Sequence, residues 1–397
     1  MKRQITIGEI AEINANSLTQ KDVFQEIMYL DTGNITRNEI DNIQVLNVVM
    51  DKIPSRAKRK VKDKTIIYST VRPNQEHYGF LENPSDNFIV STGFSTIDVY
   101  DKDTDGKFIY YLLTQKHITD YLHAIGENSV SSYPSINPDD IANLKFAVPD
   151  FKTQQSIAAV LSALDKKIAL NKQINARLEE MAKTLYDYWF VQFDFPDANG
   201  KPYKSSGGEM VFDETLKREI PKGWEVKSLG DWAEIRKGTL ITEKTANTNG
   251  DIKVISAGVD FSYYHDVANR PKNTITISAS GANAGFVNFW REPIFACDCT
   301  TITNSVIGRT LYILNFLKIV QDFIYQQARG SAQPHVYPKD IEGLKIIVPP
   351  DLLLKRFSEF VENWNLKIAN NEKQNHHLTQ LRDFLLPMLM NGQVSVE

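Results

Sequence analysis

The residues best suited to chemistry gather first in a basic stretch of the N-terminal half. The segment "DKIPSRAKRKVKDK" spans residues 51–64, and its cations are Lys52, Arg56, Lys58, Arg59, Lys60, Lys62 and Lys64, against only Asp51 and Asp63. Clustered cations of this kind contact nucleic-acid phosphates, although a solvated loop can have the same composition. The net charge of −4 argues against indiscriminate coating of nucleic acid, but a local patch acts through its own field.

Catalytic patterns are missing from the sequence. It contains no GxxxxGK[ST] phosphate loop, no GxSxG elbow, no HExxH and no aromatic-ended Asn/Asp-Pro-Pro motif. His376 and His377 are adjacent on a charged predicted helix, so they point in different directions and are expected to be solvated. The chain therefore reads as a recognition protein or scaffold that is not an enzyme and holds no metal.

The two cysteines indicate a reducing compartment. Cys297 and Cys299 alternate along a predicted strand, too close for a relaxed disulfide, and are expected to be buried thiols. No apolar run approaches the length of a membrane helix, and "MKRQITIGEI" is not followed by the apolar region of a signal peptide. These features predict a cytoplasmic protein.

A phrase occurs twice in the chain, two hundred residues apart. "NPDDIANLKFAVPD" ends at residue 150 and "YPKDIEGLKIIVPP" at residue 350, and the register continues from "KKIALN" to "LKIANN". Eight residues have an identical partner at their own number plus 200: Pro134, Pro138, Asp140, Ile141, Leu144, Lys145, Val148 and Pro149. So long a period indicates duplication of a structural module, and two copies suggest two bound partners.

A long helix is predicted after each phrase. The first has no Pro or Gly from Thr153 to Phe190, and the second runs from about Leu352 to Leu386, where Pro387 should weaken it. Both carry an apolar seam of heptad type interrupted by Asn at the same two places, Asn171 and Asn175 in one and Asn371 and Asn375 in the other. This pattern favours an antiparallel coiled coil with its register fixed by the amides; the alternative is two amphipathic helices on separate cores.

Mixed α/β segments precede both helices. Strands are predicted at 26–30, 65–70 and 87–100 and helices at 105–125 and 311–328, and residues 195–210 read as a linker or surface loop. Residues 211–350 repeat the plan of 1–150 loosely. We therefore expect an α+β fold with a pseudo-two-fold repeat, divided as 1–150 (first domain), 151–193 (helix), 194–350 (linker and second domain) and 351–397 (helix).

One carboxylate pattern has the outline of a metal-dependent nuclease motif. Asp150 follows Pro149, and Asp165 precedes Lys166 and Lys167. The second half falls on the predicted coiled-coil helix, and Pro350 replaces Asp150 in the second copy of the phrase. We therefore expect no nuclease site here.

The whole chain resembles the specificity subunits of type I restriction–modification systems. "SSYPSINPDDIANLKFAVPDFKTQQSIAAVLSALDKKIALN" resembles their central repeat, "FDFPDANGKPYKSSGGEM" with "EIPKGWEVKSLGDWAEI" their linker, and "GSAQPHVYPKDIEGLKIIVPP" their C-terminal repeat. The C-terminal repeat departs from the pattern where "DLLLKRFSEF" replaces "FKTQQSIAAV". The two partner-binding faces need not be equally strong.

The resemblance implies two target-recognition domains that each read half of a split, asymmetric DNA site. The helical repeats would separate the domains and dock two methyltransferase subunits, and motor/nuclease subunits would join them. S-adenosylmethionine, ATP and magnesium are then expected on those partners, and no cofactor on this chain. The competing hypothesis is a coiled-coil interaction scaffold that never binds DNA.

The resemblance also suggests which side chains meet DNA. In the first domain we expect phosphate contacts from Lys58, Arg59, Lys60 and Arg72, and contacts to bases and phosphates from the loop "STVRPNQEHYGF" through Asn74, Gln75, His77 and Tyr78. In the second domain the equivalent stretch is "SASGANAGFVNF" (278–289), with Gly281 and Gly285 allowing close backbone approach. The candidates are Ser280 and Asn283 in this stretch, Arg270 and Lys272 just upstream, and Gln333 in the loop "ARGSAQPHV" (328–336), which could instead brace the domain against the helix. Either loop could instead be a polar surface turn.

Overall fold

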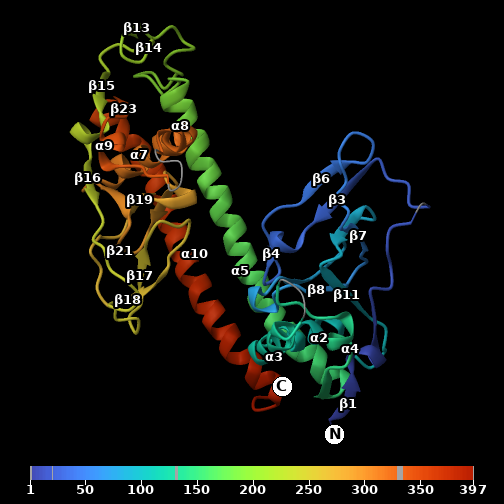
Figure 1. The fold of residues 1–397 in the computed structure, drawn as a ribbon. Helices are drawn as coiled ribbons and strands as arrows, with labels where there is room; N and C mark the ends of the chain where they lie inside the picture. Colours follow the sequence, from blue (N-terminus) through green and yellow to red (C-terminus); the bar gives the residue numbers. More distant parts are fainter. Residues whose placement is uncertain (1, 20, 130–132, 329–333, 397) are drawn as a thin grey trace. The chain divides into compact units, whose positions relative to one another are not determined.

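The fold is known from a computed structural model that describes residues 2–19, 21–129, 133–328 and 334–396. The chain forms two compact units: unit 1 comprises Met1–Ile168 and His376–Glu397, and unit 2 comprises Ala169–Asn375. Two long helices, α5 and α10, each contribute one part to unit 1 and another part to unit 2 (Figure 1).

Unit 1 contains two four-stranded sheets, with strand orders β6-β3-β10-β7 and β2-β11-β8-β9. Strand β3 runs parallel to β10, and the other pairings in these sheets are antiparallel. A separate pair joins β1 to β12. The strands are β1 (Arg3–Thr6), β2 (Ala11–Ile13), β3 (Glu26–Leu30), β6 (Gln44–Asn47), β7 (Ala57–Lys60), β8 (Ile66–Ser69), β9 (Tyr78–Phe80), β10 (Phe88–Ser91), β11 (Phe94–Val99) and β12 (Lys145–Val148), besides the short pair β4 (Ile35–Thr36) and β5 (Glu39–Ile40).

The helix predicted over residues 105–125 is two helices, α2 (Gly106–Leu113) and α3 (Lys116–Glu127). Asp105 starts α2 by accepting a hydrogen bond from the Phe108 N–H at 2.8 Å. Gln115 is buried and extended, and its side-chain amide donates to the carbonyl of Leu112 at 3.2 Å. This contact satisfies a carbonyl at the end of α2, so the helix can stop there. The apolar periodicity of the sequence continues through the break between α2 and α3, so it predicts a single helix. The small helices α1 (Ile7–Ile10) and α4 (Pro138–Ala142) complete unit 1.

Unit 2 repeats most of this topology, but one of its sheets has three strands where the sheet of unit 1 that contains β7 has four. Its sheets have the orders β16-β22-β19-β20 and β18-β17-β21, and β17 is parallel to β21 as β3 is to β10. Strand β15 pairs with β23 as β1 pairs with β12. The elements are β15 (Glu225–Ser228), α6 (Leu229–Trp232), β16 (Glu234–Lys237), β17 (Ile252–Ile255), β18 (Tyr263–His265), β19 (Thr274–Ser278), β20 (Val287–Trp290), β21 (Phe295–Ala296), β22 (Cys299–Thr303), α7 (Ile307–Ile319), α8 (Gln321–Gln327), α9 (Pro338–Glu342) and β23 (Lys345–Val348).

The segment before each repeated phrase closes onto an equivalent turn. In unit 1, Arg72 N–H donates to the Pro134 carbonyl at 2.8 Å, and Ile136 N–H donates to the Thr70 carbonyl. In unit 2, Gly281 N–H donates to the Pro334 carbonyl at 3.0 Å, and Val336 N–H donates to the Ala279 carbonyl. The two-hundred-residue offset in the sequence is therefore also an offset in the fold.

The long helices are α5 (Phe151–Tyr186), which continues as a wider π-helical turn over Asp187–Val191, and α10 (Asp351–Asn391). Helix α10 does not end near Leu386, as the sequence suggested, but continues through Pro387 for another turn to Asn391. Leu389 and Met390 are buried in the core of unit 1. Their burial offsets the hydrogen bond that Pro387 cannot donate.

Each core lies between strands and the long helices. In unit 1, Ile66 and Tyr68 of β8 belong to one buried cluster with Ile157 and Leu161 of α5. In unit 2 the corresponding cluster joins Ile275 of β19 with residues of α7, α5 and α10. Cys297 and Cys299 are buried free thiols, as expected. Among the described residues, no helix is both long enough and apolar enough to cross a membrane.

The region predicted as a linker has no strand or helix until the hairpin of β13 (Met210–Asp213) and β14 (Arg218–Pro221). It is nevertheless held in place. The Asp194 carboxylate accepts hydrogen bonds from the N–H and the hydroxyl of Ser205, at 2.7 and 2.5 Å. Phe195 stacks between Tyr203 and Trp224. The segment is therefore a folded surface loop.

Candidate nucleic-acid interface

The β8–β9 connection of unit 1 contains the polar loop that the sequence suggested. Its short 3-10 turn, Pro73–Gln75, lies between Arg72 and Glu76, which both have left-handed backbone conformations with φ of 49° and 57°. Such conformations are costly for residues other than glycine and tend to occur at functional sites. Glu76 is held by an ion pair with Arg37 at 2.5 Å, whose hydrogen bond raises the pKa of Arg37.

The candidate side chains of this loop differ in exposure. Asn74 and Gln75 are exposed. Arg72 lies over the Tyr133 ring at 4.7 Å, and the His77 Nδ1 is 2.6 Å from the Ile35 carbonyl. Tyr78 is only 6% exposed and stacks on Tyr68 in the core, where burial raises its pKa. Strand β9 begins at Tyr78 and buries its side chain, whereas His77, just before the strand, is half-buried.

Three basic candidates of unit 1, Lys58, Arg59 and Lys60, lie on the edge strand β7. Lys58 is exposed, and Arg59 is half-buried with its Nη1 3.4 Å from the Ser17 hydroxyl. Lys60 forms an ion pair with Asp22, and its hydrogen bond lowers the pKa of Asp22 to about 2. Lys58 is therefore the most available of the three cations.

Arg56, in the basic stretch, is linked to the polar loop by hydrogen bonds through one turn. Its carbonyl accepts from Thr92 N–H at 2.8 Å, and the next residue, Gly93, accepts from both the N–H and the hydroxyl of Thr70. The Thr92–Gly93 turn thus joins the start of β7 to the start of the Arg72 loop. Sequence reasoning passed over Arg56 because this link depends on how β10 and β11 pair with their neighbours.

In unit 2 the equivalent loop contains Ser280 and Asn283. Ser280 is buried and its hydroxyl donates to Asp298 at 2.5 Å, while Asn283 is half-buried at the end of the turn Gly281–Asn283. Gly281 has φ of 76°, and no atom of the described residues lies within 4 Å of the place where a Cβ would stand. Gly285 serves packing instead, because a Cβ there would lie 3.1 Å from Ile324.

Arg270 and Lys272 precede β19, whereas Ser280 follows it, so the strand separates these candidates. The Arg270 guanidinium donates to the Thr301 hydroxyl and to the carbonyls of Asn269 and Lys237, at 2.8, 2.8 and 2.9 Å. Lys272 is exposed. Gln333 lies outside the described residues.

The carboxylates of the nuclease-like pattern have structural partners. Asp150 accepts from the Thr153 N–H and hydroxyl at the start of α5. Asp165 accepts from the Tyr111 hydroxyl at 2.6 Å and from Arg382 at 3.1 Å. Within the described part of the chain, no group of three or more His, Cys, Asp or Glu residues is placed to hold a metal. Both His376 and His377 are exposed, as expected.

The two long helices pair through the predicted amides. Asn171 donates to Asn375 and Asn371 donates to Asn175, each at 2.8 Å, and Asn171 also donates to Gln374 at 2.7 Å. These contacts show that α5 and α10 run antiparallel in unit 2. Every residue of the two predicted seams is buried or half-buried. The seams are Ile157, Leu161, Leu164, Ile168, Asn171, Asn175, Leu178, Ala182, Leu185 and Trp189 in α5 with its π-helical turn, and Phe357, Val361, Trp364, Ile368, Asn371, Asn375, Leu378, Arg382, Leu385 and Leu389 in α10.

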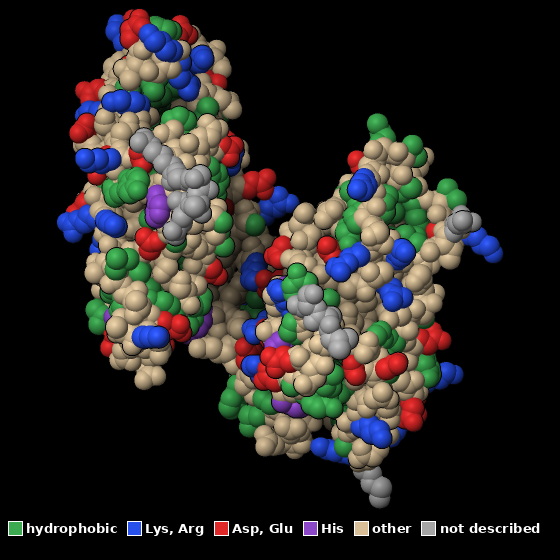
Figure 2. Space-filling view, viewed as in Figure 1, with side chains coloured by type: hydrophobic (Ala, Val, Ile, Leu, Met, Phe, Trp, Pro, Cys, Tyr) green, Lys and Arg blue, Asp and Glu red, His purple; other side chains and the backbone are tan. Residues whose placement is uncertain are grey.

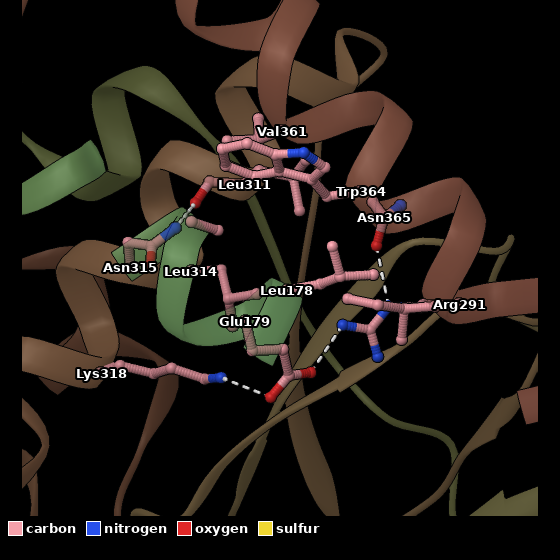
Figure 3. A pocket seen from close by; sticks show the side chains of 12 residues that line it. Leu178, Glu179, Arg291, Leu311, Leu314, Asn315, Lys318, Val361, Trp364 and Asn365 are labelled. Carbon is pink, nitrogen blue, oxygen red and sulfur yellow. Dashed lines mark hydrogen bonds and ion pairs between the residues drawn. The ribbon is translucent and has the colours of Figure 1, made fainter. Parts of the chain in front are cut away.

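An arginine in unit 2 fastens the sheet connection to both helices (Figure 3). Arg291 follows β20, and its side chain is only 9% exposed. It forms ion pairs with Glu179 of α5 at 2.8 Å and Glu372 of α10 at 2.7 Å, and donates to the Asn365 amide oxygen at 2.8 Å. The carboxyl pKa of Glu372 is raised by burial, against the effect of Arg291.

Unit 2 also has an apolar groove of about 500 Å³ along the two helices. Met181, Leu185, Tyr188 and Trp364 line it, together with Arg177, Glu180 and Thr184. Met181 and Tyr188 are exposed. An open groove of this kind suits a protein partner.

Comparisons with known proteins agree with this architecture. Residues 2–180 and 221–380 match the family described as "Type I restriction modification DNA specificity domain". The chain is 25% identical to the type I restriction enzyme HindI specificity subunit of Haemophilus influenzae, with 99% of each chain covered. It is 27% identical to the MjaIX specificity subunit of Methanocaldococcus jannaschii, covering 98% of this chain and 93% of that one.

A solved structure shares the fold. The type I restriction–modification S subunit from M. genitalium superposes with a TM-score of 0.56 at 17% identity, covering 98% of this chain and 96% of the other. The family match spans both copies of the repeated phrase and most of both units. The chain therefore belongs to the type I restriction–modification DNA specificity family.

Proposed function

We propose that this chain is the DNA-specificity subunit of a type I restriction–modification complex, and that unit 1 and unit 2 each read one half of a bipartite, asymmetric site. The observation that carries the proposal is the duplicated topology, in which the Arg72 loop and the Gly281 loop occupy the same place. The fold is repeated while the loop side chains differ, as a reader of two different half-sites requires.

Affinity and specificity are assigned to different residues. Exposed cations such as Lys58 in unit 1 and Lys272 in unit 2 are suited to phosphates, which position the protein on DNA. The exposed amides of Asn74 and Gln75 are suited to base edges. The other candidates are proposed because they lie on β7 or in or next to the two equivalent loops: Arg59, Lys60, Arg72, His77, Ser280 and Asn283.

The helices are proposed to form an antiparallel coiled coil that sets the distance between the half-sites. The paired Asn171–Asn375 and Asn371–Asn175 amides support this, because a slipped register would leave them unsatisfied. We propose that residues 1–150 and 194–350 are the two recognition segments and that residues 151–193 and 351–397 are the helical repeats. A protein that reads DNA in this way is proposed to work in the cytoplasm.

Two methyltransferase subunits are proposed to dock on the helices, with motor/nuclease subunits joining them. The groove lined by Met181 and Leu185 supports one docking face. Residues two hundred positions later on α10 support a second, because Leu381 and Phe384 are 44% and 62% exposed. The equivalents are not identical, so the two faces need not bind equally strongly.

Catalysis is assigned to the partners. Asp150 and Asp165 are engaged in structural contacts, which supports a chain without catalytic activity of its own. S-adenosylmethionine, ATP and magnesium are proposed to bind the partner subunits. The highly purified chain should therefore show no methyltransferase, nuclease or ATPase turnover above a mock preparation.

The proposal is tested by titrating duplex DNA with the full chain and its methyltransferase subunit at two salt concentrations. A DNA reader should lose affinity steeply as salt rises, because phosphate contacts release counterions. A protein scaffold without DNA binding would assemble with the methyltransferase but show no DNA affinity beyond that of the methyltransferase alone.

A further inference from the structure

An apolar tip follows the edge strand β6 in unit 1. Val48, Val49 and Met50 form a turn after the strand, with exposed fractions of 41%, 90% and 84%. Val23, which is 89% exposed, lies nearby in the chain segment whose Gln25 carbonyl accepts from the Val48 N–H at 2.9 Å. Figure 2 shows apolar side chains over this part of unit 1 with lysine and arginine side chains beside them. Groups of this kind are unusual unless they bind something.

Polar side chains hold the tip in one conformation. The Asn47 side-chain oxygen accepts from the N–H groups of Val49 and Met50, at 3.0 and 3.1 Å. The Asp51 carboxylate accepts from the Asn47 N–H at 2.7 Å, and the Asp51 N–H donates to the Asn47 carbonyl at 2.9 Å. The turn is thus ordered before any ligand binds, which lowers the entropic cost of binding.

Unit 2 has an exposed valine at the same topological position. Strand β18 pairs antiparallel with β17 as β6 pairs with β3, and Val267, two residues after β18, is 57% exposed. The flanking residues are fixed: Asp266 accepts from the Asn247 amide at 2.8 Å, and the Asn269 side chain bonds both backbone groups of Ala296. The feature recurs although the two connectors differ in sequence and length.

The charge around both tips indicates nucleic acid as the ligand. In unit 1 the exposed cations Lys52, Arg56 and Lys58 follow the tip within eight residues of Met50, against one carboxylate, Asp51, which is bonded within the turn. In unit 2 the exposed Lys272 follows Val267, whereas the Arg270 guanidinium is bonded within the chain and Asp266 accepts from the Asn247 amide. DNA matches both features, since its phosphates attract the cations and its major groove presents thymine methyl groups to apolar side chains.

We propose that Val49 and Met50 of unit 1, and Val267 of unit 2, contact thymine methyl groups in the major groove of their half-sites and so determine part of the sequence that is read. The inference rests on the proposed function. It adds exposed aliphatic side chains as residues that determine specificity. A search for hydrogen-bond donors and acceptors would not find them. Unit 1 presents two such side chains and unit 2 one, so the larger effect is expected in the half-site of unit 1.

The test uses the full chain with its methyltransferase subunits and a duplex containing its site, found by sequencing methylated adenines. Thymines of the half-site are replaced one at a time by deoxyuridine, which lacks only the methyl group. At least one replacement should weaken wild-type binding about fourfold, the effect of exposing one buried methyl group. The variant Val49→Ser/Met50→Ser should bind the thymine duplex more weakly and lose its discrimination at that position.

The matched control is Val211→Ser, which changes an exposed valine on the β13–β14 hairpin and should preserve discrimination. Half-sites without thymine, or equal binding of thymine and deoxyuridine duplexes by the wild type, would overturn the inference. So would a Val49→Ser/Met50→Ser variant that keeps its DNA affinity but no longer binds methyltransferase, because the tip would then contact protein. If the proposed function itself is wrong, the result will differ, because the wild-type protein will bind all duplexes with the same affinity.

Discussion

Arg72 and Gly281 occupy equivalent backbone positions in the two units, but Arg72 has a long cationic side chain and Gly281 has none. The N–H of each donates to the proline that precedes a repeated phrase, Pro134 or Pro334, and each has a positive φ. Arg72 adds a guanidinium over the Tyr133 ring, whereas Gly281 exposes only backbone. The fold fixes the position and leaves the side chain free to differ, so the two loops can read different bases.

Replacing Arg72 by Ala should weaken binding to specific and random duplexes by similar factors. Because the variant neutralises one phosphate fewer, the slope of log affinity against log salt should also fall by about 0.9. The checks are titrations at several salt concentrations, with Lys217→Ala, an exposed lysine next to β14, as control. An unchanged slope with altered base preference would instead make Arg72 a base-reading residue.

Asp165→Asn should lower the free energy of unfolding by about 1–3 kcal/mol, because Arg382 loses a partner in a half-buried site. Asp165 and Asp383 raise the pKa of Arg382 even though burial acts to lower it, so the cation stays charged. Urea denaturation of the chain measures the change. The matched control Asp120→Asn breaks an exposed pair with Lys116 and should cost about 0.5 kcal/mol or less.

At the scale of elements, the edge strand β7 is held by an ion pair between its Lys60 and Asp22, and this pair depends on pH. Lys60 lowers the pKa of Asp22 to about 2, below its ordinary value of 3.8. A depressed carboxyl pKa stabilises the fold above the unfolded value, and this stability is lost as the pH falls from about 4 to about 2.

Lys60→Met should therefore return the Asp22 pKa towards 3.8, which NMR titration of the carboxyl carbon can follow. The stability difference between wild type and variant should shrink as the pH falls through this window. A difference that stays constant down to about pH 2 would mean that Lys60 acts through packing alone.

Four residues inserted after Asn175 test the helices as a spacer. They add about 6 Å to α5, near two base pairs of DNA, and rotate one end by roughly 40°. The amide pairs resist the new register, so activity on the original site should fall and a spacer one or two base pairs longer should be preferred. Methylation of duplexes that differ only in spacer length gives the answer. An unchanged optimum with full activity would show that the helices do not set the distance.

The spacing of apolar residues along the sequence predicted the features that depend on local sequence alone. The long helices, their buried seams and the duplicated module follow from heptads and a fixed offset. The break at Gln115 could not be predicted, because it depends on a side-chain contact with the Leu112 carbonyl. The core position of Tyr78 and the internal bonding of Arg270 depend on strand pairing, which residue type does not reveal. The exposed Val49 tip was missed because apolar residues suggest a core rather than a ligand contact.

At the scale of the molecule, two units of one topology share two helices that run through both. Arg291 ties the sheet connection of unit 2 to both helices, and Tyr111, Asp165 and Arg382 link α2, α5 and α10 in unit 1. Within each unit, charged and hydrogen-bonded contacts therefore join the mixed α/β part to the long helices. This arrangement predicts that each unit reads its half-site independently of the other.

The most direct measurement of this claim exchanges residues 1–150 for those of another specificity subunit and sequences the methylated adenines of a genome that expresses the hybrid complex. The account predicts a bipartite site in which one half changes while the other half stays as in the parent. A site in which both halves change, or methylation without a bipartite site, would contradict it.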